Sequence, residues 1–388
     1  MRKKGFLQGL GTGFITSVVI IFGTTAFIGK DDYIETKLDL IEYTIDKYYV
    51  GELDKDEMEQ GIYRGFVAGV GDPYTAYYSP QEFSALMEQT SGIYAGIGVQ
   101  MTVDSFDNSI TVVDVFAGSP AEAAGILIGD RIVGADGVPL TGSDFDLAPT
   151  LIKGKEGTNV IVSIYRPTDN ETYELDITRQ NVVYPSVEFD MLENNIGYIE
   201  LRQFEELTHE QFKNALTELE FLGARGIVLD LRDNTGGLLN VTEKIVDELI
   251  PEGIIVSTKD NSGKIDETWA DDIYSDIPLV VLVNEQSASA SEVLSGALQD
   301  HGRAELVGTR TFGKGIVQTI LPLTDGSALK ITTSEYYTPS GVCIQGTGIE
   351  PDHYIDLPIQ LKLQSNLSYE DDLQLQKAIE VLETQLEQ

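Results

Sequence analysis

The chain has 388 residues, 42% of them hydrophobic and 23% charged, so it is long enough for two or three domains with ordinary hydrophobic cores. Its 63 acidic and 26 basic residues give a formal net charge of −37, and so negative a surface repels phosphate backbones, which argues against nucleic-acid binding. The single cysteine, Cys343, excludes an internal disulfide, and one cysteine with three histidines leaves no cluster with zinc-site spacing. We therefore expect no bound metal and no other cofactor.

Residues 1–30 combine a basic cluster with an apolar run. Three basic residues at positions 2–4 precede an uncharged stretch, 5–29, that is long enough to span a bilayer. The basic end should stay in the cytoplasm, which places the rest of the chain outside the cell membrane. A cleaved signal peptide is the alternative. The run is long for a signal peptide and no clear A-x-A site follows it, so we predict an uncleaved single-pass anchor.

Residues 31–90 are predicted to be helical. Apolar residues recur at helical spacing between positions 34 and 48, and again in a second segment, 56–70. A third helix begins at Ser79-Pro80, with Ser79 as its N-cap, and runs through Met87. These helices could pack on the body of the protein or pair between the subunits of a homodimer, and the sequence leaves both alternatives open.

Residues 91–180 change to short strands and glycine turns. One stretch has glycines where successive backbone N–H groups can point at a ligand, and it comprises Ala95, Gly96, Ile97, Gly98 and Val99. Together with Gly118-Ser119-Pro120-Ala121 and Gly129-Asp130, this region resembles a PDZ domain, the module that captures a C-terminal carboxylate by strand addition. The resemblance implies that the stretch 95–99 is the carboxylate loop and that 144–152 is the groove helix, where Pro149 is unusual.

Residues 181–360 are predicted to form an α/β unit with repeated crossovers. A strand at 196–199 precedes a helix at 208–222 with Thr208 as N-cap, and a buried strand from Gly226 leads through a glycine-rich turn to a helix at 239–250. The β-branched run 279–283 predicts another interior strand, which ends in a polar turn at Ser289 before a further helix. Residues 361–388 are predicted as a helical tail.

Ser289 is the candidate nucleophile, because a serine between a strand and a helix N-terminus lies near free backbone N–H groups that can bind an oxyanion. The alternative is a simple N-cap. His301 lies at the far end of the following helix, about 15 Å away at 1.5 Å per residue, so it is poorly placed as a base. Lys314 is the better candidate base, if burial keeps it neutral, and an extended 314–318 would place Gln318 on the same face to orient it. The alternative for Lys314 is an ordinary surface lysine.

Several motifs in order resemble the carboxyl-terminal processing (tail-specific) proteases: Leu229-Asp230-Leu231-Arg232-Asp233-Asn234-Thr235-Gly236-Gly237, Ser287-Ala288-Ser289-Ala290-Ser291-Glu292, Gly313-Lys314-Gly315 with Gln318, and Gly348-Ile349-Glu350-Pro351-Asp352. The resemblance implies a mixed α/β fold: a crotonase/Clp-protease-like core with an inserted PDZ domain, an N-terminal helical segment and a transmembrane anchor.

The same resemblance implies the roles of the site residues. Ser289 is the nucleophile, Lys314 the general base and Gln318 its orienting partner. The oxyanion hole consists of the backbone N–H groups of Ala290 and Gly236, with Gly237 as the alternative to Gly236. Cys343 stands where the family usually has a polar residue, outside these roles.

Two functions are consistent with these residues. The first is a membrane-anchored serine endopeptidase that recognises the apolar C-terminal tails of proteins through its PDZ domain and cuts through an acyl-enzyme. The second is a membrane-tethered PDZ binding protein with an inert protease-like domain. The joint presence of Ser289, Lys314 and Gln318 favours the first.

Overall fold

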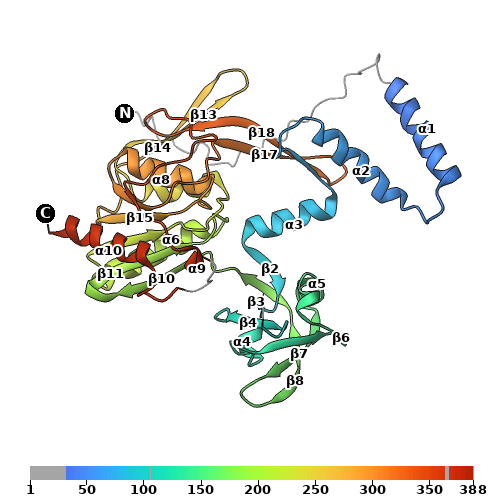
Figure 1. Ribbon diagram of the computed structural model, residues 1–388, viewed down its shortest axis with the longest axis horizontal. Helices are drawn as coiled ribbons and strands as arrows, with labels where there is room; N and C mark the ends of the chain where they lie inside the picture. Colours follow the sequence, from blue (N-terminus) through green and yellow to red (C-terminus); the bar gives the residue numbers. More distant parts are fainter. Residues whose placement is uncertain (1–31, 105, 363–366, 388) are drawn as a thin grey trace, which may run out of the picture. The chain divides into compact units, whose positions relative to one another are not determined.

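The computed structural model describes residues 32–104, 106–362 and 367–387, so the anchor predicted at 1–30 lies outside the described residues (Figure 1). None of the helices in these three ranges is both long enough and apolar enough to cross a bilayer. The chain divides into two compact units, residues 1–59 and 60–388.

The first unit contains α1 (Asp32–Tyr48), and α2 (Lys55–Ala68) begins in it. Apolar spacing predicts both helices correctly, although α2 starts one residue and ends two residues earlier than expected. Lys55 forms ion pairs with Glu42 and Asp46 of α1 at 3.0 and 3.2 Å, and all three side chains are well exposed. Water screens such exposed pairs, so they hold these two helices only weakly. Pairing of the helices between subunits stays a prediction.

The second unit includes β1 (Ala76–Tyr78) and α3 (Pro80–Ser91). The Ser79 N-cap is confirmed as part of a capping box, since its hydroxyl accepts from the Glu82 N–H and Glu82 accepts from the Ser79 N–H at 2.7 Å. The helix continues four residues beyond the expected end and stops at Gly92, whose φ of 68° suits glycine.

A small β domain follows α3. Its strands are β2 (Ile93–Gly96), β3 (Val99–Val103), β4 (Ile110–Val115), β5 (Arg131–Ala135), β6 (Val138–Pro139), β7 (Asn159–Arg166), β8 (Glu171–Thr178) and β9 (Gln180–Val183). The main sheet has the order β3-β4-β5-β7-β8, with β6 on β5, and β2 pairs with β9 as the two chain ends of the domain. A core of its own, which includes Ile110, Ile132 and Ile164, lies under the sheet together with α4 (Pro120–Ala123).

The helix predicted at 144–152 is shorter than expected. Residues Gly142–Asp144 form a 3₁₀ turn, and α5 begins only at Leu147 and ends at Ile152. Pro149 therefore falls in the first turn of α5, where a missing backbone N–H breaks no helical hydrogen bond. Proline accounts for the late start of the helix, and the expected start at 144 is wrong.

The α/β unit is built on a six-stranded sheet with the order β10-β11-β12-β15-β16-β19. These strands are β10 (Val187–Leu192), β11 (Ile196–Leu201), β12 (Gly226–Asp230), β15 (Leu279–Val283), β16 (Ala304–Gly308) and β19 (His353–Tyr354), and the 3₁₀ turn η2 (Glu193–Asn195) joins the first two. Only β10 runs antiparallel to its neighbour. The parallel strands confirm the predicted crossover architecture.

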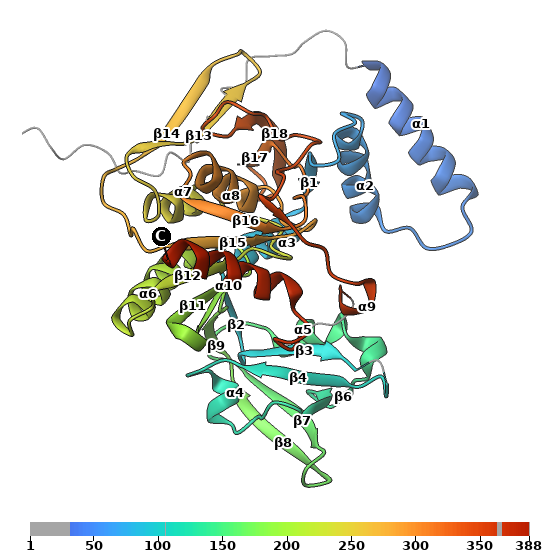
Figure 2. The same cartoon turned by 60° about the vertical axis from the view of Figure 1, so that its left-hand side comes forward.

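Helices cover both faces of this sheet. One face is covered by three helices, α6 (Thr208–Phe221), α7 (Leu239–Asp247) and α8 (Ala290–Asp300) (Figure 2). The other face is covered by α10 (Leu373–Leu386). The short helix α9 (Ile359–Lys362) precedes α10 in the chain. Along β15, Val281 faces the first group and Val280 faces α10, which explains the uninterrupted apolar run of this strand.

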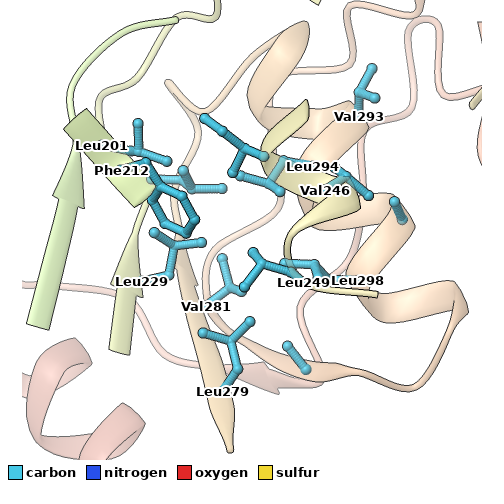
Figure 3. Close-up of a cluster of buried hydrophobic side chains, with 14 of the residues drawn as sticks. Leu201, Phe212, Leu229, Val246, Leu249, Leu279, Val281, Val293, Leu294 and Leu298 are labelled. Atoms are coloured by element: carbon cyan, nitrogen blue, oxygen red, sulfur yellow. The ribbon is translucent and has the colours of Figure 1, made fainter. Parts of the chain in front are cut away.

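Figure 3 shows Leu229 and Val281 of the sheet facing Val246 and Leu294 of the helices. Each such fully buried side chain contributes about 1.5–3 kcal/mol, so this cluster holds β15 and α8 in place.

Two details of the helix predictions are wrong. Thr208 is not the N-cap of α6 but its first residue, because its hydroxyl accepts from the Glu205 N–H and its own backbone is already helical. The α7 helix ends at Asp247 rather than at Ile250, because the next residues turn to reach the strand β13 (Gly253–Asp260).

A second sheet packs beside the first and carries the segment that contains Lys314. Its order is β1-β18-β13-β14, and β17 also pairs with β18. The additional strands are β14 (Ile265–Ala270), β17 (Ile316–Pro322) and β18 (Ala328–Tyr337). The β17–β18 hairpin begins just after Lys314, and the Phe312 N–H donates to the Ser287 carbonyl at 3.0 Å, which holds the lysine segment next to the turn that follows β15.

Candidate active site

The ends of two parallel strands, β12 and β15, meet at one edge of the sheet of the α/β unit, as the sequence predicts. The pairing of β12 with β15 places Asp230 opposite Leu282, so the turns that follow these strands leave the sheet side by side. They are joined by a hydrogen bond of 3.1 Å from the Ala288 N–H to the Asn234 carbonyl. The serine turn and the glycine-rich turn therefore form one site.

Buried polar side chains fix both turns. Asn234 is fully buried and donates to the Leu201 carbonyl at 2.7 Å, while the Ser291 hydroxyl donates to the Asn234 carbonyl at 2.8 Å. The fully buried Ser287 hydroxyl donates to the Leu231 carbonyl at 2.7 Å. Because buried polar groups without partners are costly, these bonds favour a single arrangement of the two turns.

Ser289 is held in a strained backbone conformation at the start of α8. Its φ of 56° and ψ of −111° lie outside the regions that side-chain-bearing residues normally adopt. Such strain costs about 1–3 kcal/mol and persists only where the surrounding structure imposes it. The next residues, from Ala290 to Leu298, are buried, whereas Ser289 itself is half-buried and so remains accessible.

Gly236 packs directly against the serine turn. A β-carbon at position 236 would lie 2.8 Å from the Ala288 carbonyl oxygen, 2.9 Å from the Ser289 β-carbon and 3.1 Å from the Ala290 nitrogen, so any side chain there would crowd the nucleophile candidate and the N–H that follows it. The Gly236 N–H donates to the Asn234 side chain at 2.8 Å. No acceptor for the Gly237 N–H occurs among the described residues, which favours Gly237 over Gly236 as the second oxyanion donor.

The Glu292 carboxylate connects the serine to the lysine segment. Its Oε2 accepts from the Ser289 and Lys314 backbone N–H groups, each at 2.8 Å, and its Oε1 accepts from the Gly313 N–H at 2.7 Å and the Thr311 hydroxyl at 2.6 Å. Glu292 is fully buried. Four donors on one carboxylate compensate its loss of hydration and fix the two segments relative to each other.

Tyr336 of β18 makes a second connection. Its hydroxyl lies 3.0 Å from the Ser289 carbonyl oxygen and also contacts the Lys314 carbonyl oxygen. The side chain is almost completely buried, and burial raises the pKa of its phenol well above the ordinary value, so it serves as a donor. Glu292 and Tyr336 thus hold the serine and lysine backbones through both their N–H and their carbonyl groups.

The Lys314 side chain lies in an environment that favours its neutral form. Burial lowers the pKa of its amine below that of an ordinary lysine, and the nearby Lys330 ammonium lowers it further. The carboxylates of Glu292 and Asp72 act in the opposite direction. The amine stands 4.8 Å from the centre of the Tyr74 ring. Among the described residues no hydrogen bond joins it to the Ser289 hydroxyl.

Lys314 and Gln318 do not lie on one regular strand, which is the condition for their predicted common face. The strand β17 begins only at Ile316, and its register with β18 shifts between Val317 and Gln318, which breaks the alternation of side chains. The Gln318 amide donates to the Ile316 carbonyl at 3.4 Å rather than contacting the Lys314 amine.

His301 lies at the C-terminal end of α8, as expected. Its Nε2 stands 2.8 Å from the Ile254 carbonyl oxygen, and its ring packs against Gly253. These contacts give the histidine a structural role at the opposite end of the helix from Ser289.

The loop predicted to bind a carboxylate connects β2 to β3. The Ile97 and Gly98 carbonyls accept from the Ala121 and Phe116 N–H groups at 2.8 and 3.0 Å, which fixes the loop. In the part of the chain that the structure describes, the Ile97 and Gly98 N–H groups have no acceptor of their own. Gly98 has a φ of 83°, and a side chain there would collide with Ser119. Ala95, Gly96 and Val99 lie in the two flanking strands.

Three residues around the site were not predicted to take part in it: Tyr74, Glu292 and Tyr336. The sequence contains a pattern that could have indicated a role for Glu292, since a glutamate three residues after a serine is typical of a capping box. The two tyrosines reach the site from distant strands and turns, and nothing in their local sequence indicates this.

Comparisons with known proteins agree with this geometry. Residues 195–355 match peptidase family S41, and residues 95–178 match the PDZ domain. The chain is 36% identical over 321 residues to the carboxy-terminal-processing protease of Bartonella bacilliformis, covering 81% of this chain and 73% of that protein. It is 34% identical over 342 residues to the carboxyl-terminal-processing protease of Synechocystis sp., covering 87% of this chain and 80% of that protein.

Among solved structures, the chain resembles the photosystem II D1 C-terminal processing protease, with 35% identity, a TM-score of 0.48, and coverage of 81% of this chain and 88% of that one. The sequence relatives, with the two matched domains, show that this chain belongs to peptidase family S41, as a carboxyl-terminal processing serine protease with a PDZ domain.

Proposed function

We propose that the chain is an endopeptidase that cuts proteins near their C-terminal tails, with Ser289 as nucleophile and Lys314 as general base. One observation carries this proposal: the half-buried lysine with a lowered pKa and the strained serine are held to each other by Glu292. A base that works near neutral pH must be partly neutral, and nucleophile and base must be held in place together.

The proposed reaction proceeds in two halves. Neutral Lys314 takes the proton of the Ser289 hydroxyl as its oxygen attacks the peptide carbonyl, and the resulting oxyanion accepts from the Ala290 N–H and a glycine N–H. Lys314 then gives the proton to the leaving amine, which leaves an acyl-enzyme on Ser289. A water that loses a proton to Lys314 hydrolyses the ester.

Proton transfer requires the lysine amine to approach the serine hydroxyl more closely than it does here, and such contacts often tighten when substrate binds. Gln318 is proposed as the uncharged partner of the lysine, with its amide oxygen accepting from the amine. Since its amide now donates to Ile316, this role requires a rotation of the Gln318 side chain.

The PDZ domain is proposed to read the substrate's C-terminal carboxylate. The Ile97 and Gly98 N–H groups have no acceptor among the described residues, and this supports the role because a carboxylate is held well by successive backbone N–H donors. The substrates are then proteins with exposed, apolar tails. The apolar run at 5–29 supports a single-pass anchor with the catalytic part outside the cytoplasm, and homodimer formation through the N-terminal helices is a further proposal.

Cleavage of an unstructured protein with an apolar C-terminus, by the full chain in detergent, tests this function. We expect cleavage of the free acid, much slower cleavage of the same protein with an amidated C-terminus, and none by Ser289→Ala. A folded wild-type protein that binds the tail and never cuts it would instead identify a PDZ binding protein.

A further inference from the structure

A tyrosine from the N-terminal part of the chain contacts the amine of Lys314. Tyr74 lies in the turn between α2 and β1, and the Lys314 amine stands 4.8 Å from the centre of its ring. Cation–ring contacts are significant within about 6 Å of the ring centre. The ring is half-buried, so it also keeps water from one side of the amine.

The turn that carries Tyr74 is fixed to β18. Asp72 accepts from the Thr75 and Thr332 hydroxyls, each at 2.6 Å, and from the Tyr74 N–H at 3.1 Å. The Thr332 N–H in turn donates to the Thr75 hydroxyl at 3.2 Å. The Thr332 and Thr75 hydroxyls lower the pKa of Asp72, so it accepts these bonds as a carboxylate.

The adjacent strand reinforces this placement. β1 pairs with β18 so that Ala76 lies opposite Lys330, and β18 also pairs with β17, which begins two residues after Lys314. The turn and the lysine are therefore positioned by the same strand. A ring held in this way restricts where the amine can lie.

We propose that Tyr74 is a positioning residue for the general base: its ring holds the Lys314 amine in place and limits its hydration, so that the segment between α2 and β1 sets the reactivity of the site. This inference rests on the proposed function, in which Lys314 is the base. The charged groups that face this amine are Lys330 on β18, Glu292 on α8 and Asp72 in the turn.

Three variants of the full-length protein test the inference. Tyr74→Leu removes the ring, Tyr74→Phe keeps it, and Tyr78→Leu removes a matched ring that lies 5.4 Å from the Lys330 amine in the same region. We expect Tyr74→Leu to lower kcat about tenfold or more while KM changes less than about twofold. Its pH profile should move to higher pH, because water solvates an ammonium better than a ring face does. Tyr74→Phe and Tyr78→Leu should match the wild type.

A second readout does not depend on activity. In a Ser289→Ala background, the rate of acetylation of Lys314 by acetic anhydride is followed against pH by mass spectrometry. The pH at which labelling is half-maximal should rise in Tyr74→Leu and be unchanged in Tyr74→Phe and Tyr78→Leu. If Tyr74→Leu does not fold, Thr332→Val, which removes the hydroxyl that β18 donates to Asp72 and so loosens the turn, should raise the pH midpoint of labelling in the same direction.

The outcomes separate the two claims. Unchanged kcat, pH profile and labelling in a folded Tyr74→Leu protein, or unchanged labelling in Thr332→Val, would overturn the role of Tyr74 even if Lys314→Arg is inactive. An active Lys314→Arg protein would instead overturn the proposed base, whatever Tyr74 does.

Discussion

The carboxylate of Glu292 lies 2.8 Å from the backbone nitrogen of Lys314, a residue 22 positions further along the chain. The same oxygen accepts from the backbone N–H of Ser289. The segments that carry the proposed nucleophile and base are therefore held together by a buried carboxylate, with Tyr336 as a second link, rather than by their own side chains.

Glu292→Gln should damage both stability and activity. A glutamine offers one oxygen to the four donors that the carboxylate accepts, and its amide group would face an N–H. We expect the free energy of unfolding to fall by about 3 kcal/mol, measured by urea denaturation, with cleavage reduced about a hundredfold. Glu210→Gln is the matched control, because Glu210 is the third residue of α6 as Glu292 is of α8, but exposed. Wild-type cleavage by Glu292→Gln would refute the role of this carboxylate.

Tyr336→Phe should reduce turnover with little change in substrate binding. The variant removes the hydroxyl that contacts the Ser289 and Lys314 carbonyl oxygens. Leaving these two carbonyl oxygens without that donor costs about 1–2 kcal/mol, so we expect a similar loss of stability and a roughly tenfold lower kcat. Tyr337→Phe is the control, since its hydroxyl bonds the exposed Glu335. Equal effects of the two substitutions would contradict a specific role for Tyr336.

Gly236→Ala should abolish most cleavage while tail binding persists. The added methyl group would press on the Ser289 β-carbon and the Ala290 nitrogen, next to the proposed oxyanion donors. Loss of one oxyanion contact lowers kcat about 10²–10³-fold. Gly263→Ala has a comparable φ, +85°, but open space around the new β-carbon, so it controls for backbone strain. If both variants lose activity equally, strain rather than the oxyanion site is responsible.

Glu205 should make the protein less stable as the pH rises. The residue is only 5% exposed, and its Oε2 has no hydrogen-bond partner among the described residues. Burial raises the pKa of its carboxyl group from the ordinary value of 4.5 to about 7. Between pH 4.5 and about 7 the folded state holds a proton that the unfolded state has lost. The free energy of unfolding therefore falls as the pH rises through this range, and it levels off above about pH 7. Glu205→Gln should be about 2 kcal/mol more stable than the wild type at alkaline pH and similar at acidic pH, measured by urea denaturation. The exposed neighbour Glu206 supplies the control Glu206→Gln; a wild-type pH dependence in Glu205→Gln would contradict the assignment.

Apolar periodicity in the sequence predicts most of the individual helices and strands. The apolar run of β15 and the small residues after Ser289 indicate a strand and a helix, and the structure has both. The strand predicted from Lys314 begins only at Ile316, and the contact beside its start is tertiary: the Gly315 N–H donates to the Gln345 side chain at 2.7 Å, and a β-carbon on Gly315 would lie 2.6 Å from the Gln345 nitrogen. Tyr74 and Tyr336 reach the site through β-pairing of distant segments, which no local pattern encodes.

The most direct test of the Ser289–Lys314 mechanism is cleavage measured against pH for the wild type, Lys314→Arg and His301→Gln. Activity of the wild type should rise with pH as the lysine loses its proton, with a midpoint below that of an ordinary lysine, because burial lowers its pKa. Lys314→Arg keeps the charge but stays protonated, so it should fold, bind tails and not cut. His301→Gln should cut at nearly the wild-type rate, since that histidine contacts the Ile254 carbonyl and Gly253 at the opposite end of α8 from Ser289. An active Lys314→Arg enzyme, or a folded but inactive His301→Gln enzyme, would contradict the assignment of Lys314 as the base.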